Sequence, residues 1–447
     1  TMKVVALWFD RLLLLLLPYL IAPPYMALSQ AEASGDRPLR VLVVGAGSIS
    51  REFSLRHFTQ SSTGTVVAGI VDLDESKARE LAADVGSAQA GAKVRDADNN
   101  KYRAAAQQRR GAPVPHFTSL DVALGEGTCG GEGDEGIDIV YIGTTPNSHL
   151  GLVEAALNRG KHVLLEKPIA ATRKDADAIV AAAEHAYPNL VVGMNIGMRY
   201  NEALIEMKRR ILEAKELGPS SSSKLQATLK THFAQWPREW QIQPWCAGRM
   251  EGGPLREVGT HFFSALLEFS GAHDELHSSA VSKPVTARIR ANVSYPENGG
   301  SDASQQLCET SASGEIVMAG GSLPPGGLAV DLSVRTDAPR DIYELEISAA
   351  EAASPAPATT EKSFTLFDFC SLRRSGPDDV LVRNASYGRK ECVLALVSEI
   401  KRIKNDCHPE LGSQIPSIVT ARHGRNAQLM LEAILNSNGK WITIEFE

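Results

Sequence analysis

Apolar and polar positions alternate in blocks at the start of the folded part of the chain. One apolar run covers residues 41–44 and a second covers residues 66–71, with a short glycine-containing segment after the first. Between the two runs, Phe53, Leu55 and Phe58 fit a helix. The pattern therefore predicts a strand, a glycine turn, a helix and a second strand, which together make one βαβ unit.

The turn of this unit has the residues that a dinucleotide-binding site needs. Gly45 allows a tight turn, and Gly47 lets the backbone approach a pyrophosphate. The helix that follows presents free N–H groups and the positive end of its dipole. Asp72, about 20 residues further on, can accept hydrogen bonds from ribose hydroxyls. Ser50 stands where the usual fingerprint has its third glycine.

Two further apolar runs end in polar motifs. Residues 137–142 lead into the segment 143–149, and residues 162–165 lead into Glu166-Lys167-Pro168. Ligands of a doubly wound sheet bind at the carboxyl ends of its strands, so both motifs are candidate contacts for a cofactor.

Three residues of these motifs have separate expected roles. Pro146 fixes a turn, and Asn147 is expected to cap the helix that begins after it. Lys167 lies at a strand end, beside the expected cofactor, where a lysine can act as an acid or a base.

The second half of the chain shows a period of two in several stretches. Along residues 285–293, apolar side chains alternate with Thr, Arg, Arg and Asn, which predicts a strand with one polar face. Further strands are predicted at residues 190–195, 224–233, 328–334, 342–347, 364–369 and 441–444, and helices at residues 75–85, 173–186, 201–215 and 420–435.

A third motif, residues 252–261, contains an acid and a histidine four residues apart. If a helix begins here, this spacing places Glu257 and His261 on one face. Histidine titrates near neutrality, which makes His261 a candidate base. Glu257 could orient His261 or bind another hydroxyl group. The sequence leaves open whether Lys167 or His261 takes a proton.

Three tryptophans, Trp236, Trp240 and Trp245, come shortly before this motif. Aromatic faces stack on sugar rings, but they also fill cores and interfaces. The sequence does not decide between these two interpretations.

The composition narrows the class of protein. The chain has 447 residues, of which 43% are hydrophobic and 22% charged, and this is typical of a globular protein of about two or three domains. Its formal net charge of -7 argues against nucleic acid as a partner, because binding of phosphates needs a basic surface. The six cysteines form no CxxC pair, so the sequence gives no indication of a metal site.

Residues 1–37 resemble a secretory signal peptide. Lys3 precedes an apolar core at residues 12–22, and Ala31 or Ala33 provides a small residue for cleavage. The uninterrupted apolar length is short for a bilayer, so we expect no stable membrane span in the mature chain. The segment predicts the secretory pathway or an organelle, with an uncleaved anchor as an alternative. If the segment has no targeting function, the protein is expected to be cytoplasmic.

The motifs together resemble the glucose-fructose oxidoreductase, inositol dehydrogenase and rhizopine-catabolism family (Gfo/Idh/MocA). The order and spacing match as well as the residues, and the resemblance is strongest from residue 137 to 201. It implies an α/β Rossmann domain with a doubly wound parallel sheet at residues 38–170. It also implies an α+β domain with a large open, mostly antiparallel sheet at residues 171–447. In this family that sheet often forms a subunit interface, so we expect a homo-oligomer. The motifs that carry the resemblance are Gly45-x-Gly47, Asp72, residues 145–149 and residues 160–168.

The resemblance also implies the residues of the site. Residues 252–261 are similar to the family's Gly-Gly…Asp-x-Gly-x-His signature, whose acid and histidine surround the substrate carbon together with the lysine of Glu-Lys-Pro. Glu257 stands where most relatives have Asp, and its side chain is longer by about one C–C bond. The expected catalytic residues are Lys167, Glu257 and His261. The expected substrate contacts are Lys167, Arg199, Trp245 and His261. The expected cofactor contacts are Gly45, Gly47, Ser48, Ile49, Asp72, Thr144, Thr145, Pro146, Asn147, His149, Glu166, Lys167 and Asn195.

The implied function is hydride transfer between a nicotinamide cofactor and a sugar, a polyol or a related hydroxyl compound. Asp72 favours NAD because a carboxylate repels the 2′-phosphate of NADP, while the nearby Arg51 and Lys77 leave NADP as an alternative. Two other functions are a sensor that binds the dinucleotide without turnover and an interaction subunit that uses only the open sheet. The retained Lys167 and His261 argue against a sensor, whereas the change to Glu257 leans slightly towards one.

Overall fold

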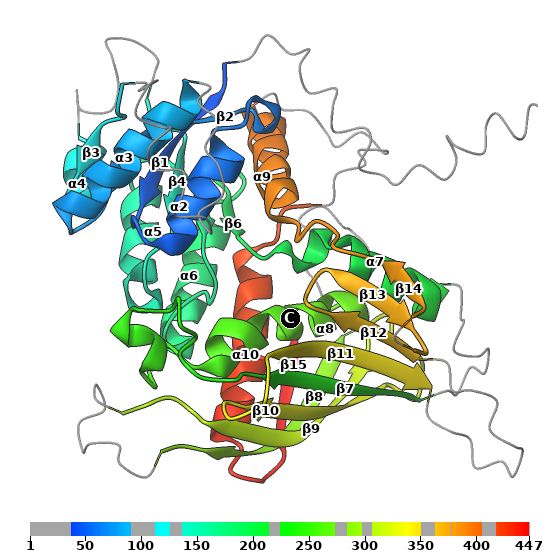
Figure 1. Ribbon diagram of the computed structural model, residues 1–447. Coiled ribbons are helices and arrows are strands. Elements are labelled where there is room, and N and C mark those ends of the chain that lie inside the picture. The colour runs from blue at the N-terminus through cyan, green and yellow to red at the C-terminus, as the bar shows by residue number, and fades with distance from the viewer. Residues whose placement is uncertain are drawn as a thin grey trace, which may run out of the picture.

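The computed structural model of the chain contains two β-sheets with helices packed around and between them (Figure 1). The structure describes residues 37–90, 112–125, 136–213, 224–272, 284–296, 306–349, 363–376, 378–404 and 417–446. The predicted targeting segment lies outside these ranges except for its last residue.

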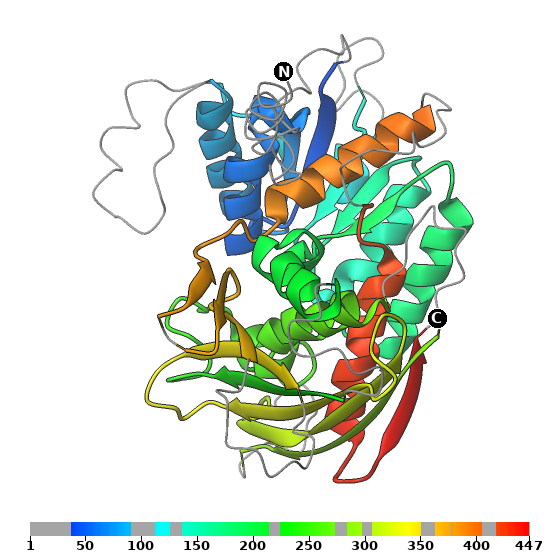
Figure 2. The same ribbon diagram turned by 90° about the vertical axis from the view of Figure 1, so that its right-hand side faces the viewer.

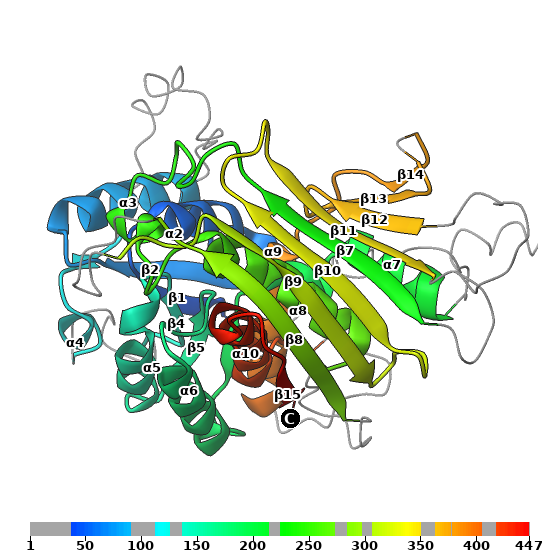
Figure 3. The same cartoon turned by 90° about the horizontal axis from the view of Figure 1, so that it is seen from below.

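The first sheet is parallel, and in the described residues its strands follow the spatial order β3-β2-β1-β4-β5-β6. Helices α2 and α3 cover one face and α5 and α6 the other (Figure 3). The predicted doubly wound sheet is therefore confirmed. Its strands are β1 (Leu39–Val44), β2 (Thr65–Val71), β3 (His116–Phe117), β4 (Ile139–Ile142), β5 (His162–Leu165) and β6 (Val192–Met194). Its helices are α2 (Ser48–Phe53), α3 (Glu75–Gln89), α4 (Leu120–Ala123), α5 (His149–Leu157) and α6 (Arg173–Ala186).

The parallel sheet continues past residue 170, where the sequence analysis ended the first domain. Strand β6 pairs with β5, and Gly193 lies opposite Leu164. Thr172 caps the connecting helix α6 by accepting a hydrogen bond from the N–H of Asp175. Because α6 and β6 complete one more crossover on the same sheet, the boundary moves beyond Met194.

The second sheet is mostly antiparallel, and its order in the described residues is β14-β13-β12-β11-β7-β10-β9-β8-β15. Strand β7 lies in its interior, parallel to β10 and antiparallel to β11. Figure 3 looks onto its outer face, and helices lie on the opposite side. The strands are β7 (Leu225–His232), β8 (Val285–Ser294), β9 (Ser311–Gly320), β10 (Leu328–Arg335), β11 (Ile342–Ala349), β12 (Ser363–Phe367), β13 (Ser371–Arg374), β14 (Val380–Val382) and β15 (Ile442–Phe446).

Four longer helices follow β6 in the described part of the chain. They are α7 (Glu202–Lys208), α8 (Thr260–Ser270), α9 (Arg389–Lys404) and α10 (Ala421–Asn436). Helices α8 and α10 lie between the two sheets (Figure 1). Helix α9, which the sequence analysis missed, returns to the first domain and lies along it (Figure 2). An ion pair between Arg389 and Glu52, with 2.6 Å between their charged atoms, fixes its beginning against α2. No helix in the described part of the chain is long and apolar enough to cross a membrane.

Candidate active site

The glycine turn after β1 has one position that requires glycine and one that leaves space. Gly45 has φ +93°, and a Cβ there would lie 2.7 Å from the carbonyl oxygen of Gly143. Gly47 is exposed, and a Cβ added to it would have no heavy atom within 4 Å. The turn is therefore packed against β4 on one side and open on the other, as close approach of a pyrophosphate requires.

Ser50 replaces the third glycine of the fingerprint, and helix α2 still packs closely against the end of β4. Its side chain is buried, and its hydroxyl donates to the carbonyl oxygen of Gly143 at 3.3 Å. A Cβ on Gly143 would collide with this hydroxyl. The close contact of helix and strand thus depends on a glycine directly after the neighbouring strand β4.

Asp72 closes the turn through its carboxylate. Its Oδ2 accepts the N–H of Ala46 at 2.6 Å, and its Oδ1 accepts the N–H of Asp74 at 2.9 Å. A carboxylate oxygen has two lone pairs, so each can still accept a ribose hydroxyl. Asp72 is therefore fixed in place beside the turn by the backbone around it.

Both cations near Asp72 already have carboxylate partners. Arg51 pairs with Asp84, and its Nη2 lies 3.3 Å from Glu80. Lys77 lies 3.7 Å from the carboxylate of Asp74.

The loop after β4 is organised by hydrogen bonds within residues 144–149. The hydroxyls of Thr144 and Ser148 lie 2.7 Å apart. The expectation that Asn147 caps α5 is wrong, because the helix begins at His149 with Ser148 as the preceding residue and no side-chain cap. The exposed Asn147 instead accepts from the hydroxyl of Thr145, and its N–H donates to Glu251 at 2.9 Å. The loop is thereby joined to the segment that precedes α8.

His149 was expected to contact the cofactor, but the structure buries it completely. Its two ring nitrogens lie 3.1 Å from the carbonyl oxygens of Ile169 and Thr144. Burial lowers the pKa of His149, although these carbonyls oppose the shift. The imidazole connects the loops after β4 and β5, and its position leaves no exposed edge for a ligand.

The carboxylate of Glu166 is buried at the end of β5. It accepts from the hydroxyl of Tyr141 at 2.7 Å and from the amide of Asn195. Burial, together with the neighbouring carboxylate, raises the pKa of Tyr141 well above its ordinary value. The Oδ1 of Asn195 is buried without a hydrogen-bond partner in the described residues. Such an acceptor is open to a donor from a ligand.

The structure brings Lys167 and Glu257 together from distant parts of the chain. The Nζ of Lys167 donates to the backbone carbonyl of Glu257 at 3.0 Å and lies 3.6 Å from its carboxylate. The side chains are 14% and 12% exposed, so both remain accessible to a ligand. A π-helical turn (Leu255–Gly259) carries Glu257 and leads directly into α8.

His261 lies in the first turn of α8 and has a partner that the sequence analysis missed. Its Nδ1 lies 2.6 Å from the hydroxyl of Tyr387, a residue just before α9. Burial, followed by the positive charges of Lys167, Arg389 and Arg238, holds the pKa of His261 well below its ordinary value. Burial also raises the pKa of Tyr387 strongly. At neutral pH the pair is therefore a neutral imidazole beside a neutral phenol.

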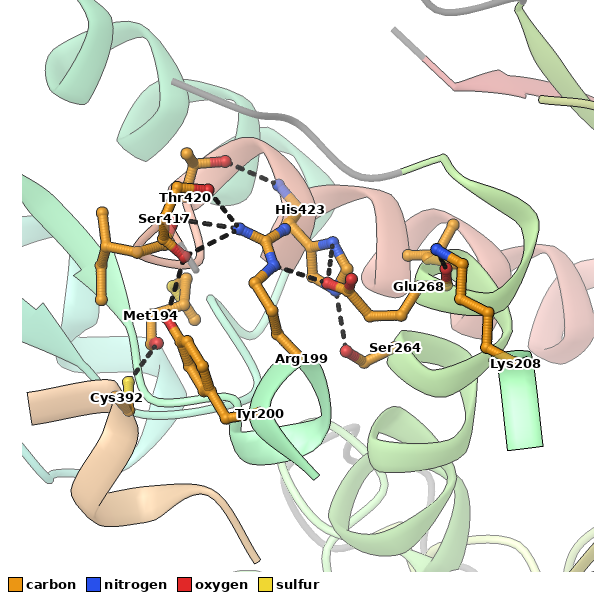
Figure 4. Close-up of polar contacts among 12 residues, drawn as sticks. Met194, Arg199, Tyr200, Lys208, Ser264, Glu268, Cys392, Ser417, Thr420 and His423 are labelled. Carbon is orange, nitrogen blue, oxygen red and sulfur yellow. Dashed lines mark hydrogen bonds and ion pairs between the residues drawn. The ribbon is translucent and has the colours of Figure 1, made fainter. Parts of the chain in front are cut away.

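Arg199 was expected to contact the substrate, but it is buried in a polar network between α8 and α10 (Figure 4). Its Nε donates to Glu268 at 2.8 Å, and one Nη donates to the carbonyl oxygen of Ile418 at 3.0 Å. Glu268 also lies 3.5 Å from His423. A buried guanidinium needs such partners, so Arg199 fixes the helix that carries His261, and its contact with a substrate stays a prediction.

Trp245 lies in a 3₁₀ turn (Pro244–Ala247) and is half-buried. Its predicted contact with the substrate stays a prediction. The described residues contain no group of three His, Cys, Asp or Glu side chains that could hold a metal ion.

Comparison with known proteins adds a sequence match over the first domain. Residues 39–194 match an oxidoreductase family with an NAD-binding Rossmann fold. A 1,5-anhydro-D-fructose reductase from Ensifer adhaerens is 37% identical over 108 residues, which are 24% of this chain and 32% of the reductase. An inositol 2-dehydrogenase from Saccharopolyspora erythraea is 33% identical over 155 residues, 35% of this chain and 42% of the dehydrogenase. The matched regions thus span less than half the length of these curated relatives.

The fold is shared over a longer stretch. The crystal structure of an oxidoreductase from Thermotoga maritima superimposes on 91% of this chain and 98% of its own length, with a TM-score of 0.61 and 14% sequence identity. This similarity extends to the second sheet.

Proposed function

Because residues 39–194 of this chain belong to the Gfo/Idh/MocA oxidoreductase family, with its NAD-binding Rossmann fold, we propose that the protein is an NAD(P)-dependent oxidoreductase. Its substrate is a hydroxyl or carbonyl compound related to sugars and polyols, as the names of the anhydrofructose reductase and the inositol dehydrogenase suggest. The observation that supports this most is the contact of Lys167 with Glu257, near His261, at the carboxyl end of β5.

Oxidation of an alcohol moves a hydride from carbon and a proton from oxygen. A bound nicotinamide dinucleotide would supply the hydride acceptor. His261, neutral because its pKa is lowered, takes the proton from the hydroxyl group. Lys167 donates a hydrogen bond to the reacting oxygen and is held in place by Glu257. The proton and the hydride thus leave the same substrate to two different acceptors.

The pairing with Tyr387 sets which ring nitrogen of His261 can act as the base. When Nδ1–H donates to the phenol oxygen, the hydrogen-free nitrogen is Nε2. Tyr387 is a positioning residue in this role, because it acts through the imidazole.

We expect the rate of alcohol oxidation to fall at acid pH only below pH 6.5, the ordinary pKa of histidine. A histidine with a lowered pKa stays neutral, and so remains a base, until the pH falls through that lowered value.

Tyr387→Phe should lower kcat about 10-fold while KM changes little, since it removes one hydrogen bond to the base. Initial rates between pH 4 and 9 measure both effects. A fall in rate that begins above pH 7 would show that another group is the base.

The residues of the first domain fit a dinucleotide. The space beside Gly47 and the unpartnered Oδ1 of Asn195 are observations independent of the family match. Gly47, Ser48 and Asp72 would hold the dinucleotide, with Ile49, Thr144, Thr145 and Pro146 as further proposed contacts.

NAD is expected to bind at least about 10-fold more tightly than NADP. Asp72 repels a 2′-phosphate, and neither Arg51 nor Lys77 is available to compensate, because both already pair with carboxylates. Titration of NADH and NADPH fluorescence against the protein tests this expectation. Equal affinities would mean that one of these ion pairs opens readily for the phosphate.

Turnover tests the proposed function directly. Nicotinamide absorbance is followed after adding NAD with a panel of aldoses, inositols and sugar acids to protein that begins near residue 35. Reduction of NAD with any of these compounds supports the proposed oxidoreductase activity. Tight dinucleotide binding without turnover on the whole panel would favour the sensor, and absence of dinucleotide binding would exclude both.

The outer face of the second sheet supports a further proposal, namely a homo-oligomer. Along β10, alternate residues are buried and partly or fully exposed, so one side of the sheet remains available (Figure 3). Sedimentation equilibrium measures this, and a monomer at micromolar concentration would contradict it. Nucleic acid is not a proposed partner, given the net charge of -7.

Residues 1–31 are proposed to direct the chain to the secretory pathway or an organelle, on the strength of their apolar core. N-terminal sequencing of protein from its native source tests this. A mature chain that keeps these residues would contradict cleavage.

A further inference from the structure

Arg238 lies in the loop between β7 and the glycine motif before α8, among aromatic rings. Its guanidinium carbon is 4.4 Å from the ring centre of Trp240 and 5.4 Å from that of Trp236. Its Nε donates to the side-chain oxygen of Gln241 at 3.0 Å. The side chain is half-buried, while Trp240 is 62% exposed. The guanidinium is therefore held in one orientation with part of its surface accessible.

This loop belongs to the same region as the candidate active site. The indole N–H of Trp236 donates to the carbonyl oxygen of Cys246 at 3.0 Å, and the N–H of Gly253 donates to the same oxygen at 3.1 Å. Arg238 is thus connected through one carbonyl to the motif that carries Glu257.

A continuous row of rings runs from the loop to His261. Phe233 contacts Trp236, with ring centres 4.8 Å apart, and Tyr343, with ring centres 5.5 Å apart. Tyr343 contacts Phe369 at 5.0 Å, and Phe369 contacts His261 at 5.8 Å. We call these rings the aromatic row. It connects the guanidinium at one end with the candidate base at the other through packed rings, of which Phe233 is fully buried.

Of the cations that act on His261, not all have a carboxylate partner in the described residues. Lys167, Arg389 and Arg238 are the cations whose charges act on His261. Lys167 is paired with Glu257, and Arg389 is paired with Glu52. Arg238, in contrast, has no carboxylate partner in the described part of the chain.

The neighbouring acid does not compensate for Arg238. Asp341 accepts the hydroxyl of Tyr343 at 2.8 Å and the N–H of Ala234 at 2.8 Å, and in the described residues it forms no ion pair with Arg238. A half-buried guanidinium that is stacked on rings and has no carboxylate partner in the described residues is a candidate site for an anion.

We propose that Arg238 binds the carboxylate of an acidic sugar-like substrate, an aldonic or uronic acid, whose reacting carbon lies near Lys167 and His261. This inference rests on the proposed function and specifies its substrate class. The planar fork of one arginine matches one carboxylate in a bidentate pair. A phosphate dianion would need further cations, and the other two near His261 are already paired.

The experiment compares matched substrates that differ only in the acid group. The kcat/KM of the wild type is measured for the matched pairs glucose and glucuronate, and galactose and galacturonate, and in addition for gluconate and glucose 6-phosphate. We expect the acids to be preferred at least about 10-fold. Arg238→Met should raise KM for the acids about 10- to 100-fold, leave kcat nearly unchanged and leave the neutral sugars unaffected. Arg238→Lys should restore part of the preference.

A matched control separates recognition from packing. Arg249 is also stacked on a ring, 3.7 Å from the centre of Tyr295, but it is not among the cations that act on His261. Arg249→Met should leave the preference for acids intact. An equal loss of acid preference in both variants would overturn the proposal, as would equal turnover of neutral and acidic partners or a preference for the sugar phosphate.

Binding is measured in addition to turnover, so that a failure of the proposed enzyme activity can be told apart from a failure of the proposed carboxylate site at Arg238. Quenching of tryptophan fluorescence by glucuronate and by glucose is titrated in the presence of NADH, in the wild type and in Arg238→Met. If the wild type prefers the acid and Arg238→Met does not, the inference on Arg238 is supported, even if no compound is turned over. Absence of turnover would then count only against the proposed enzyme activity. Equal binding of acid and neutral compound would overturn the inference.

Discussion

Lys167→Ala is expected to lower kcat/KM for alcohol oxidation by at least about 100-fold, the scale of a lost acid–base or hydrogen-bonding group at a reacting atom. Lys167 is the cation that contacts Glu257 through both its carbonyl and its carboxylate. Removing it takes away the donor to the reacting oxygen and leaves the carboxylate of Glu257 without its partner. Steady-state kinetics on the best substrate of the panel measures the loss.

The same variant should still bind NADH, because the glycine turn and Asp72 are untouched. Lys174→Ala is the matched control, since Lys174 is exposed on α6, a few residues further along the chain. It should retain full activity. If Lys167→Ala keeps more than about a tenth of the wild-type kcat/KM, Lys167 does not act at the reacting atoms.

Gly47→Ala is expected to weaken dinucleotide binding at least about 10-fold while leaving the melting temperature unchanged. The backbone at Gly47 has φ -72° and ψ 179°, which alanine adopts without strain. An added Cβ meets no protein atom within 4 Å, so the fold tolerates it. The methyl group would instead occupy the space through which a pyrophosphate approaches the backbone.

Two other glycines provide the comparison for this prediction. Gly151, in α5, also has open space around an added Cβ, and Gly151→Ala should leave binding unchanged. Gly45→Ala should lower the melting temperature as well, because Gly45 has φ +93° and its Cβ would press on Gly143. NADH titration and thermal melts of the three variants separate binding from folding. Unaltered NADH affinity in Gly47→Ala would place the dinucleotide elsewhere.

Much of the fold could be predicted from local pattern. Strands β1, β2, β4 and β5 are continuous apolar runs that are buried on both faces, and α6 begins and ends where the sequence analysis placed it. Strand β9 was missed because its sequence, SASGEIVMAG, has small residues where an alternating pattern would show large ones. Helix α9 was missed although Val393, Leu396 and Ile400 have helical spacing.

The candidate site was predicted in part. Lys167, Glu257 and His261 come from motifs, and the structure places them near one another. Arg199 and His149 belong to equally recognisable motifs but are buried among structural partners. A motif records residue type and spacing, whereas burial depends on what other segments pack against it.

The sequence alone determined the elements whose causes are local. A glycine at a positive φ, an acid at a strand end and a two-residue period act over a few residues, so they can be read from the chain. Only the tertiary structure decided which distant groups meet. Tyr387 reaches His261 because α9 returns to the first domain, and Arg238 lacks a carboxylate because none is packed beside it in the described residues. Hydrogen bonds and desolvation depend on distances of a few ångströms, and these are set by packing between segments more than 100 residues apart.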